Sequence, residues 1–73
     1  MRITKFVHSC LLVETSDRTA VFDPGNYSET DFDESRLRRI DNIFITHEHA
    51  DHCSPILIRR LLARFPEARI TAT

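Results

Sequence analysis

The sequence predicts an α/β domain of the α+β type, in which mainly antiparallel strands are covered by one helix. Short apolar segments separated by polar turns are typical of strands that pair in an antiparallel sheet. The segment after Pro55 instead repeats its apolar residues at helical spacing, and a further strand follows it. The five expected strands span residues 3–7, 10–14, 19–22, 42–46 and 69–73.

The first three strands are joined by short polar connections. Residues 15–18 predict a hairpin turn. Residues 23–26, Asp-Pro-Gly-Asn, end the third strand, because Pro fixes its own φ and Gly accepts the positive φ that a tight turn often needs. Residues 27–33 are polar and are expected to be irregular. A short helix is predicted over residues 34–39, with Asp33 as its N-cap.

The longer helix is predicted to begin shortly after the fourth strand. Ser54 can cap its free N–H groups, and Pro55 suits the first helical turn. Pro66 ends it. The apolar side of this helix consists of Leu57, Ile58, Leu61, Leu62 and Phe65, with Arg59, Arg60 and Arg64 opposite.

Length and composition restrict the class of protein. The chain has 73 residues, 41% of them hydrophobic and 29% charged, which leaves room for one small domain. A net charge of −1 gives no reason to expect a nucleic-acid or membrane partner, and we interpret the clustered arginines as solvated helix faces. Two cysteines, Cys10 and Cys53, make no disulfide framework, and no apolar leader precedes the first strand. We therefore expect a cytoplasmic protein with both thiols free.

Six consecutive residues after the fourth strand, His47-Glu48-His49-Ala50-Asp51-His52, hold three histidines and an aspartate. Neutral imidazole and ionised carboxylate are preferred zinc ligands near pH 7. In an extended segment alternate side chains share a face, so His47, His49 and Asp51 should project to one side, with His52 brought round by a turn. Left without a metal, such a polar cluster would be costly at the end of an apolar strand. The sequence therefore predicts a metal site.

A closed, purely structural zinc site is the alternative interpretation of this cluster. Such sites favour cysteine-rich ligand sets with a gap between ligand pairs. Four ligands within six residues, none of them a thiolate, favour an open catalytic site. Cys53 is expected to pack at the start of the helix, and Glu48, which should face away from the ligands, is assigned no role.

The spacing of this cluster resembles the His-x-His-x-Asp-His signature of the metallo-β-lactamase superfamily. Residues 19–25, Thr-Ala-Val-Phe-Asp-Pro-Gly, are similar to the strand of that family that ends in Asp and a Gly-containing turn. Residues 6–13 resemble the start of its lactonase-like and phosphodiesterase-like branch, although Val7 stands where that branch usually has Gly. The resemblance implies that residues 1–73 form the N-terminal part of a single αββα sandwich domain, and that this domain is incomplete.

The resemblance also implies roles for the motif residues. His47 and His49 would bind a first metal ion, and Asp51 and His52 a second. The ions, zinc by ligand type with manganese or iron as alternatives, would activate water for attack on a carbonyl or phosphoryl centre. The implied activity is hydrolysis of a small lactone, ester, thioester or phosphodiester, with no nucleic acid involved.

Two further residues are candidates by the same resemblance. Asp23 would lie behind the metal ligands and accept the spare N–H of a ligand imidazole; the alternative is an ordinary turn residue before Pro24. His8 would border the cleft and, with Asp51, act in catalysis by contacting substrate or stabilising charge. The alternative for His8 is a half-exposed residue at a strand end.

A complete site of this family also needs a third histidine and a bridging aspartate from later strands. After His52 the chain contains neither residue type, and Glu67 is its one carboxylate there. We therefore expect the chain to be the N-terminal piece of a longer hydrolase and to be inactive alone. Two alternatives are a small zinc-binding module, dimeric through its exposed sheet edge, and a remnant that neither binds metal nor folds.

Overall fold

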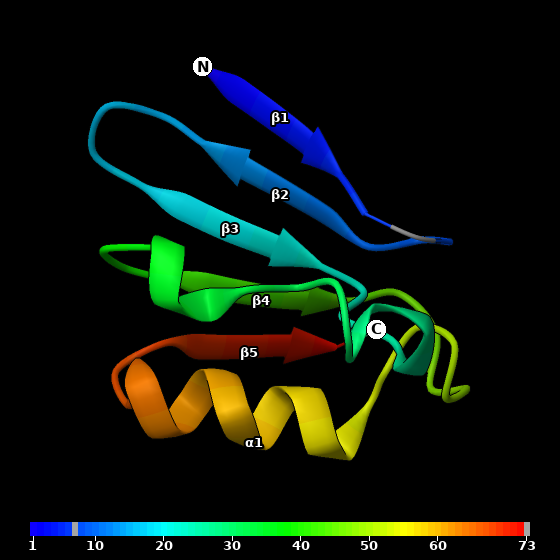
Figure 1. The fold of residues 1–73 in the computed structure, drawn as a ribbon. Coiled ribbons are helices and arrows are strands. Elements are labelled where there is room, and N and C mark those ends of the chain that lie inside the picture. The colour runs from blue at the N-terminus through cyan, green and yellow to red at the C-terminus, as the bar shows by residue number, and fades with distance from the viewer. Residues whose placement is uncertain (7, 73) are drawn as a thin grey trace.

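The computed structural model describes residues 1–6 and 8–72, which form one five-stranded sheet with a helix packed against it (Figure 1). The strands lie in the sheet in the same order as in the chain. Two 3-10 helices lie between the third and fourth strands, and the α-helix lies between the fourth and fifth. The elements are β1 (Arg2–Lys5), β2 (Leu11–Glu14), β3 (Thr19–Phe22), η1 (Asn26–Ser28), η2 (Glu34–Arg36), β4 (Asn42–Ile45), α1 (Pro55–Arg64) and β5 (Arg69–Ala72).

The sheet is mixed. The first three strands form an antiparallel meander, whereas β4 pairs parallel to β3 and β5 pairs parallel to β4. Parallel neighbours need a long crossover connection, and α1 provides it between β4 and β5. The carboxyl ends of β3 and β4 consequently meet at one end of the sheet, with Phe22 paired to Phe44. The segments that carry Asp23 and the histidine motif begin at this end.

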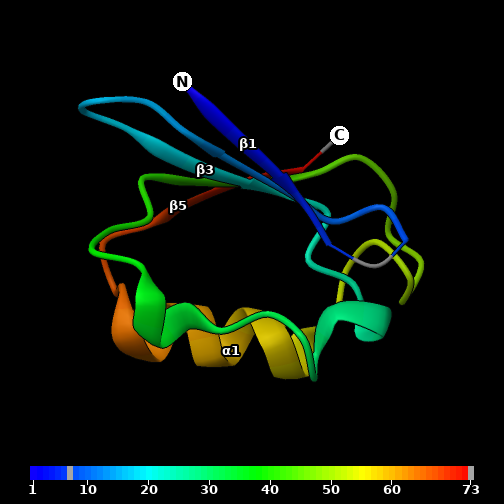
Figure 2. The same cartoon turned by 45° about the horizontal axis from the view of Figure 1, so that its top comes forward.

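The core lies between the sheet and a layer formed by α1, η1 and η2. Figure 2 shows these three elements on one side of the sheet. Val21, Ile43, Leu57 and Leu61 have no exposed surface, because alternate strand residues and one stripe of the helix face each other across this interior. Phe32, from the loop between the 3-10 helices, completes the layer and is also buried.

The opposite face of the sheet carries apolar side chains that the described part of the chain leaves uncovered. The Phe22 and Phe44 rings stack there with centroids 4.9 Å apart, and both residues are half-buried. Ile3, on the same face, is 59% exposed. The prediction of strands covered by a single α-helix is therefore confirmed, and α1 covers one face of the sheet only, within the described residues.

The predicted caps are confirmed. Ser54 accepts a hydrogen bond from the Leu57 amide at 3.1 Å, and Pro55 is the first residue of α1. The Asp33 side chain accepts from the Ser35 amide at 3.1 Å, as expected of an N-cap. Both signals depend only on neighbouring residues, which explains why the sequence was sufficient.

The predicted helix over residues 34–39 was too long. A 3-10 turn ends at Arg36, and Leu37 is extended, with φ −100° and ψ 144°. Leu37 is buried in the core, and this packing ends the helix before Arg39. The segment expected to be irregular contains part of the short η1. Residue 7 of the expected first strand and residue 73 of the expected last strand lie outside the described residues.

Both cysteines are free, as predicted; Cys10 is buried and Cys53 is half-buried against the core. Burial raises the pKa of the Cys10 thiol to about 11. Within residues 1–6 and 8–72, no helix is long and apolar enough to cross a membrane.

Candidate metal centre

The loop that carries the histidine motif is bonded to the loop that follows β3. The Asn26 amide donates to the Ala50 carbonyl at 2.8 Å, and the Ser54 amide donates to the Pro24 carbonyl at 2.9 Å. These backbone bonds lie on either side of Asp51 in the sequence. The position of the motif is therefore set by the carboxyl end of β3 as well as by β4.

Gly25 is required at the closest approach of these two loops. A Cβ added to it would lie 1.9 Å from the Asp51 carbonyl oxygen and 2.9 Å from the His52 backbone nitrogen. Both distances are too short for a carbon atom, so there is no room for a side chain here. The expectation of a positive φ at Gly25 was wrong, because its φ is −92°. The glycine is needed for close backbone contact and not for a left-handed turn.

Asp23 occupies the left-handed position instead, with φ 51°. Its buried carboxylate accepts the Thr46 amide at 2.7 Å and the Thr46 hydroxyl at 2.8 Å. Burial raises the pKa of Asp23, but the two hydrogen bonds from Thr46 and the nearby His52 ring outweigh it and hold the pKa below its usual value. Asp23 is therefore an ionised carboxylate that joins the end of β3 to the end of β4.

The same carboxylate lies behind His52. Asp23 Oδ2 is 3.3 Å from His52 Nδ1, a nitrogen that is buried and has no aligned hydrogen bond. The opposite ring nitrogen, Nε2, lies 3.5 Å from Asp51 Oδ2. One imidazole nitrogen of His52 therefore faces Asp23 and the other faces Asp51; the role of Asp23 behind a metal ligand stays a prediction.

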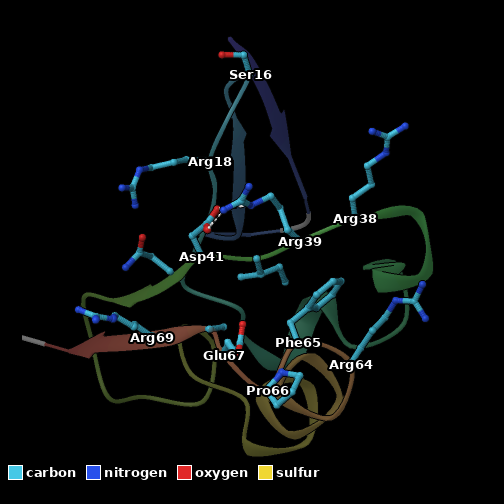
Figure 3. Close-up of a pocket in the computed structure, with 13 residues that line it drawn as sticks. Ser16, Arg18, Arg38, Arg39, Asp41, Arg64, Phe65, Pro66, Glu67 and Arg69 are labelled. Carbon is cyan, nitrogen blue, oxygen red and sulfur yellow. Dashed lines mark hydrogen bonds and ion pairs between the residues drawn. The ribbon is translucent and has the colours of Figure 1, made fainter.

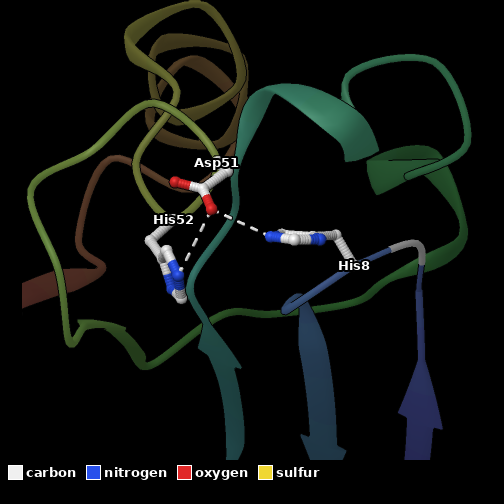
Figure 4. Close-up of side chains that lie close together, drawn as sticks. All are labelled: His8, Asp51 and His52. Carbon is white, nitrogen blue, oxygen red and sulfur yellow. Dashed lines mark hydrogen bonds and ion pairs between the residues drawn. The ribbon is translucent and has the colours of Figure 1, made fainter.

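Three potential ligands, one of them His52 itself, converge at this end of the sheet (Figure 4). His8, Asp51 and His52 each offer one ligand atom, and these atoms all lie within 4.8 Å of one another. His8 Nε2 is 2.9 Å from Asp51 Oδ2, close enough for a hydrogen bond. This hydrogen bond from His8 is the main cause that holds the pKa of Asp51 below its usual value.

His8 belongs to the loop between β1, the edge strand of the sheet, and β2. His8 has a left-handed backbone, with φ 66°, and its carbonyl accepts a hydrogen bond from Lys5 Nζ at 2.5 Å. The neighbouring Ser9 hydroxyl donates to the Asp51 carbonyl at 3.0 Å. The Tyr27 ring lies against His8, with ring centroids 5.0 Å apart. Residues of two other segments, Tyr27 and Asp51, therefore contact the His8 ring.

The remaining motif histidines do not lie where the alternation argument placed them. Strand β4 ends at Ile45, so residues 47–51 follow a loop and have no strand faces. The His47 ring contacts the His52 ring, with centroids 4.5 Å apart, and its Nδ1 is 2.9 Å from the Thr46 hydroxyl. His49 is exposed, and its carbonyl accepts the amides of His52 and Cys53 at 2.9 Å, which forms the turn.

A sequence profile of the metallo-β-lactamase superfamily matches residues 3–55, more than half of the chain. The chain belongs to this superfamily. The matched residues include the β1–β2 loop, the end of β3 and the whole histidine motif, which are the segments that meet at the candidate site.

Curated relatives of this superfamily member are considerably longer. Protein Rv0786c of Mycobacterium tuberculosis is 38% identical over 72 residues, which are 99% of this chain and 32% of the relative. A UPF0173 protein of Pyrococcus abyssi is 40% identical over 71% of this chain and 23% of its own length. A UPF0173 metal-dependent hydrolase of Mesorhizobium japonicum is 37% identical over 78% of this chain and 26% of its own length. The chain thus spans about a third or less of these proteins. No solved structure matches it significantly.

The residues present at the candidate site fit a divalent ion. Two imidazoles and a carboxylate within 4.8 Å of one another are a donor set that suits zinc, with manganese or iron also possible by ligand type. Asp23 stands at hydrogen-bonding range from the rear nitrogen of His52, as the carboxylate behind a metal-binding histidine does. The binding roles of His47, His49, Asp51 and His52 stay predictions.

Sequence reasoning missed two contributions to the site. His8 was expected to border the cleft and to contact substrate or stabilise charge; that its ring also lies within ligand distance of Asp51 and His52 was not foreseen. Thr46, which directly follows β4, was not singled out, yet its amide and its hydroxyl both donate to the Asp23 carboxylate. A signal for Thr46 was present, since a hydroxyl directly before the motif is within reach of a carboxylate on the parallel neighbour of its strand.

Proposed function

We propose that the protein to which this chain belongs is a metal-dependent hydrolase acting on a small lactone, ester, thioester or phosphodiester. The observation that carries the proposal is the convergence of His8, Asp51 and His52 at the carboxyl ends of β3 and β4. Membership of the metallo-β-lactamase superfamily supports it, as does the 37% identity to a protein named a metal-dependent hydrolase.

Asp51 and His52 would hold the ion, with His8 and His47 as the nearest additional donors. A bound divalent ion supplies Lewis acidity, which activates water and polarises the electrophile. Asp23 would fix the orientation and tautomer of His52 through its Nδ1. Asp23 would position a ligand and would not contact substrate, and its burial behind the His52 ring supports this role.

His8 is suited to a role at the substrate side of the site. Its side chain is 46% exposed, compared with 20% for His52, so it faces the surface while its Nε2 reaches Asp51. A histidine in this position can donate a proton to a leaving group or hold negative charge on a substrate. Tyr27, which is 58% exposed and contacts the His8 ring, lies at the same opening.

The proposal is tested on the protein isolated from its own cells, in whatever length it occurs. Metal content is measured first, and hydrolysis of a panel of lactones, thioesters and phosphodiesters is then followed before and after chelation. We expect bound zinc, turnover of one substrate class, loss of turnover on chelation and recovery with added metal.

Matched variants separate the site from the fold. His52→Ala should lose most of the bound metal and the activity, whereas Glu48→Gln, an exposed residue in the same loop, should retain both. Full turnover in the His52→Ala protein would refute the proposal. Zinc bound at this site without hydrolysis of any substrate would instead favour a non-catalytic metal-binding module.

A further inference from the structure

A second cleft lies at the end of the sheet opposite the candidate metal centre. It occupies about 1060 Å³ between the starts of β4 and β5 and the carboxyl end of α1. Five arginines and two carboxylates line it, which gives a local charge of +3 in a chain whose net charge is −1. The cleft is therefore a basic site on an otherwise acidic protein.

Asp41 lines this cleft, and both its carboxylate oxygens and its backbone N–H and C=O groups are hydrogen-bonded. Its carboxylate accepts the Thr19 amide at 2.7 Å and pairs with Arg39 at 3.0 and 2.5 Å. Its backbone donates to the Thr19 carbonyl at 2.8 Å and accepts the Arg69 amide at 3.0 Å. Asp41 thus joins the starts of β3, β4 and β5 and neutralises Arg39, so the framework around the arginines is fixed.

The other four arginines keep their charge available. Arg18, Arg38, Arg64 and Arg69 form no ion pair with any described residue; Arg64 lies 5.8 Å from the centroid of the Phe65 ring. Figure 3 shows Arg18 and Arg69 on one side of the cleft and Arg38 and Arg64 on the other, with the Arg39–Asp41 pair between them. Positive charge is therefore presented on both sides of a neutralised centre.

This arrangement selects a class of ligand. Guanidinium groups bind phosphoryl oxygens in a planar, bidentate geometry that a lysine ammonium cannot reproduce. The four arginines outside the Arg39–Asp41 pair carry more positive charge than one phosphate can neutralise, which favours a ligand with several linked phosphoryl groups. We propose that this cleft binds a small ligand that carries linked phosphoryl groups, independently of the metal centre.

The proposal is tested by calorimetric titration of the purified chain with sodium tripolyphosphate at low salt. EDTA in the buffer excludes binding through metal at the other end of the sheet. We expect one tripolyphosphate per chain, weaker binding of orthophosphate, and a marked loss of affinity as the salt concentration rises.

Two double variants test the two sides separately. Arg18→Gln with Arg69→Gln, and Arg38→Gln with Arg64→Gln, should each weaken tripolyphosphate binding about tenfold or more. These side chains are exposed, and a circular dichroism spectrum confirms that each variant is folded. A control with Arg36→Gln and Arg59→Gln removes the same charge outside the cleft and should change the affinity less than about threefold.

The outcomes are distinct. Loss of binding in both cleft variants but not in the control supports the proposal. Absence of tripolyphosphate binding, or an equal loss in the control, overturns it. Binding of a single-stranded oligonucleotide without binding of tripolyphosphate also overturns it, because the partner would then be a nucleic-acid backbone and not a small ligand.

Discussion

The substitution Gly25→Ala tests how the candidate site is assembled. The added methyl group would lie 1.9 Å from the carbonyl oxygen of Asp51 and 2.3 Å from its carbonyl carbon. Both neighbours are backbone atoms, so no side-chain rotation can relieve the contact. Either the loop after β3 or the loop that carries the histidine motif must move.

The cost of this movement follows from the bonds that it breaks. Separating the loops lengthens the Asn26–Ala50 and Ser54–Pro24 backbone hydrogen bonds, which are now 2.8 and 2.9 Å long. Two such bonds contribute about 1–3 kcal/mol together, and overpacking adds about 1–3 kcal/mol. Alanine tolerates a φ of −92°, and the reduced entropy of its unfolded chain restores about 0.4–1 kcal/mol. The steric contact dominates, and these contributions add up to a net loss of about 1–5 kcal/mol.

Urea unfolding followed by circular dichroism measures this loss, with Glu48→Ala as a control in the same loop. Zinc affinity, measured by competition with a chromogenic chelator, should fall in parallel, because Asp51 and His52 move with the loop. A Gly25→Ala protein as stable as the native chain, or more stable, would refute the close approach of the two loops.

Three further predictions concern other parts of the molecule. Asp23→Asn should weaken zinc binding by about 10–100-fold in the chelator competition, because it leaves His52 without its carboxylate; unchanged affinity would count against that role. Arg60 lowers the pKa of Glu34 below its ordinary 4.5, so the stability from this ion pair is present above about pH 4.5 and is lost as the pH falls through the lower folded pKa. Urea unfolding of Glu34→Gln should accordingly depend less on pH in that acidic range, and an identical dependence would contradict the pairing. Cys10, whose pKa is about 11, should react with iodoacetamide at pH 8 much more slowly than Cys53, and equal rates by mass spectrometry would show that Cys10 is not buried.

Local signals in the sequence predicted most elements of the fold. Ser54 and Pro55 start α1, and Asp33 caps η2, because capping depends on residues within one helical turn. The strands could be predicted from short apolar segments, because this pattern too is confined to a few neighbouring residues. The predicted helix over residues 34–39 was wrong beyond Arg36, because the burial of Leu37 in the core overrides local helical preference.

The site was harder to predict because it depends on contacts between distant segments. The histidine motif was recognisable from its ligand types and spacing, but alternation could not order its side chains once β4 ended at Ile45. His8 and Asp51 are 43 residues apart in sequence, and their 2.9 Å contact follows from the pairing of strands β1 to β4. No periodic pattern in the sequence carries that information.

The left-handed backbones of His8 and Asp23 show that the protein itself sets the geometry of this site. Aspartate and histidine are among the non-glycine residues enriched at positive φ, yet each such conformation costs of order 1 kcal/mol. At φ 66° and 51° the two residues are held by Lys5 and Thr46, neither of which is a candidate ligand. Because these supports are hydrogen bonds from the chain, the orientation of both side chains follows from the fold. Weakening the supports should therefore change metal affinity without removing a single donor atom.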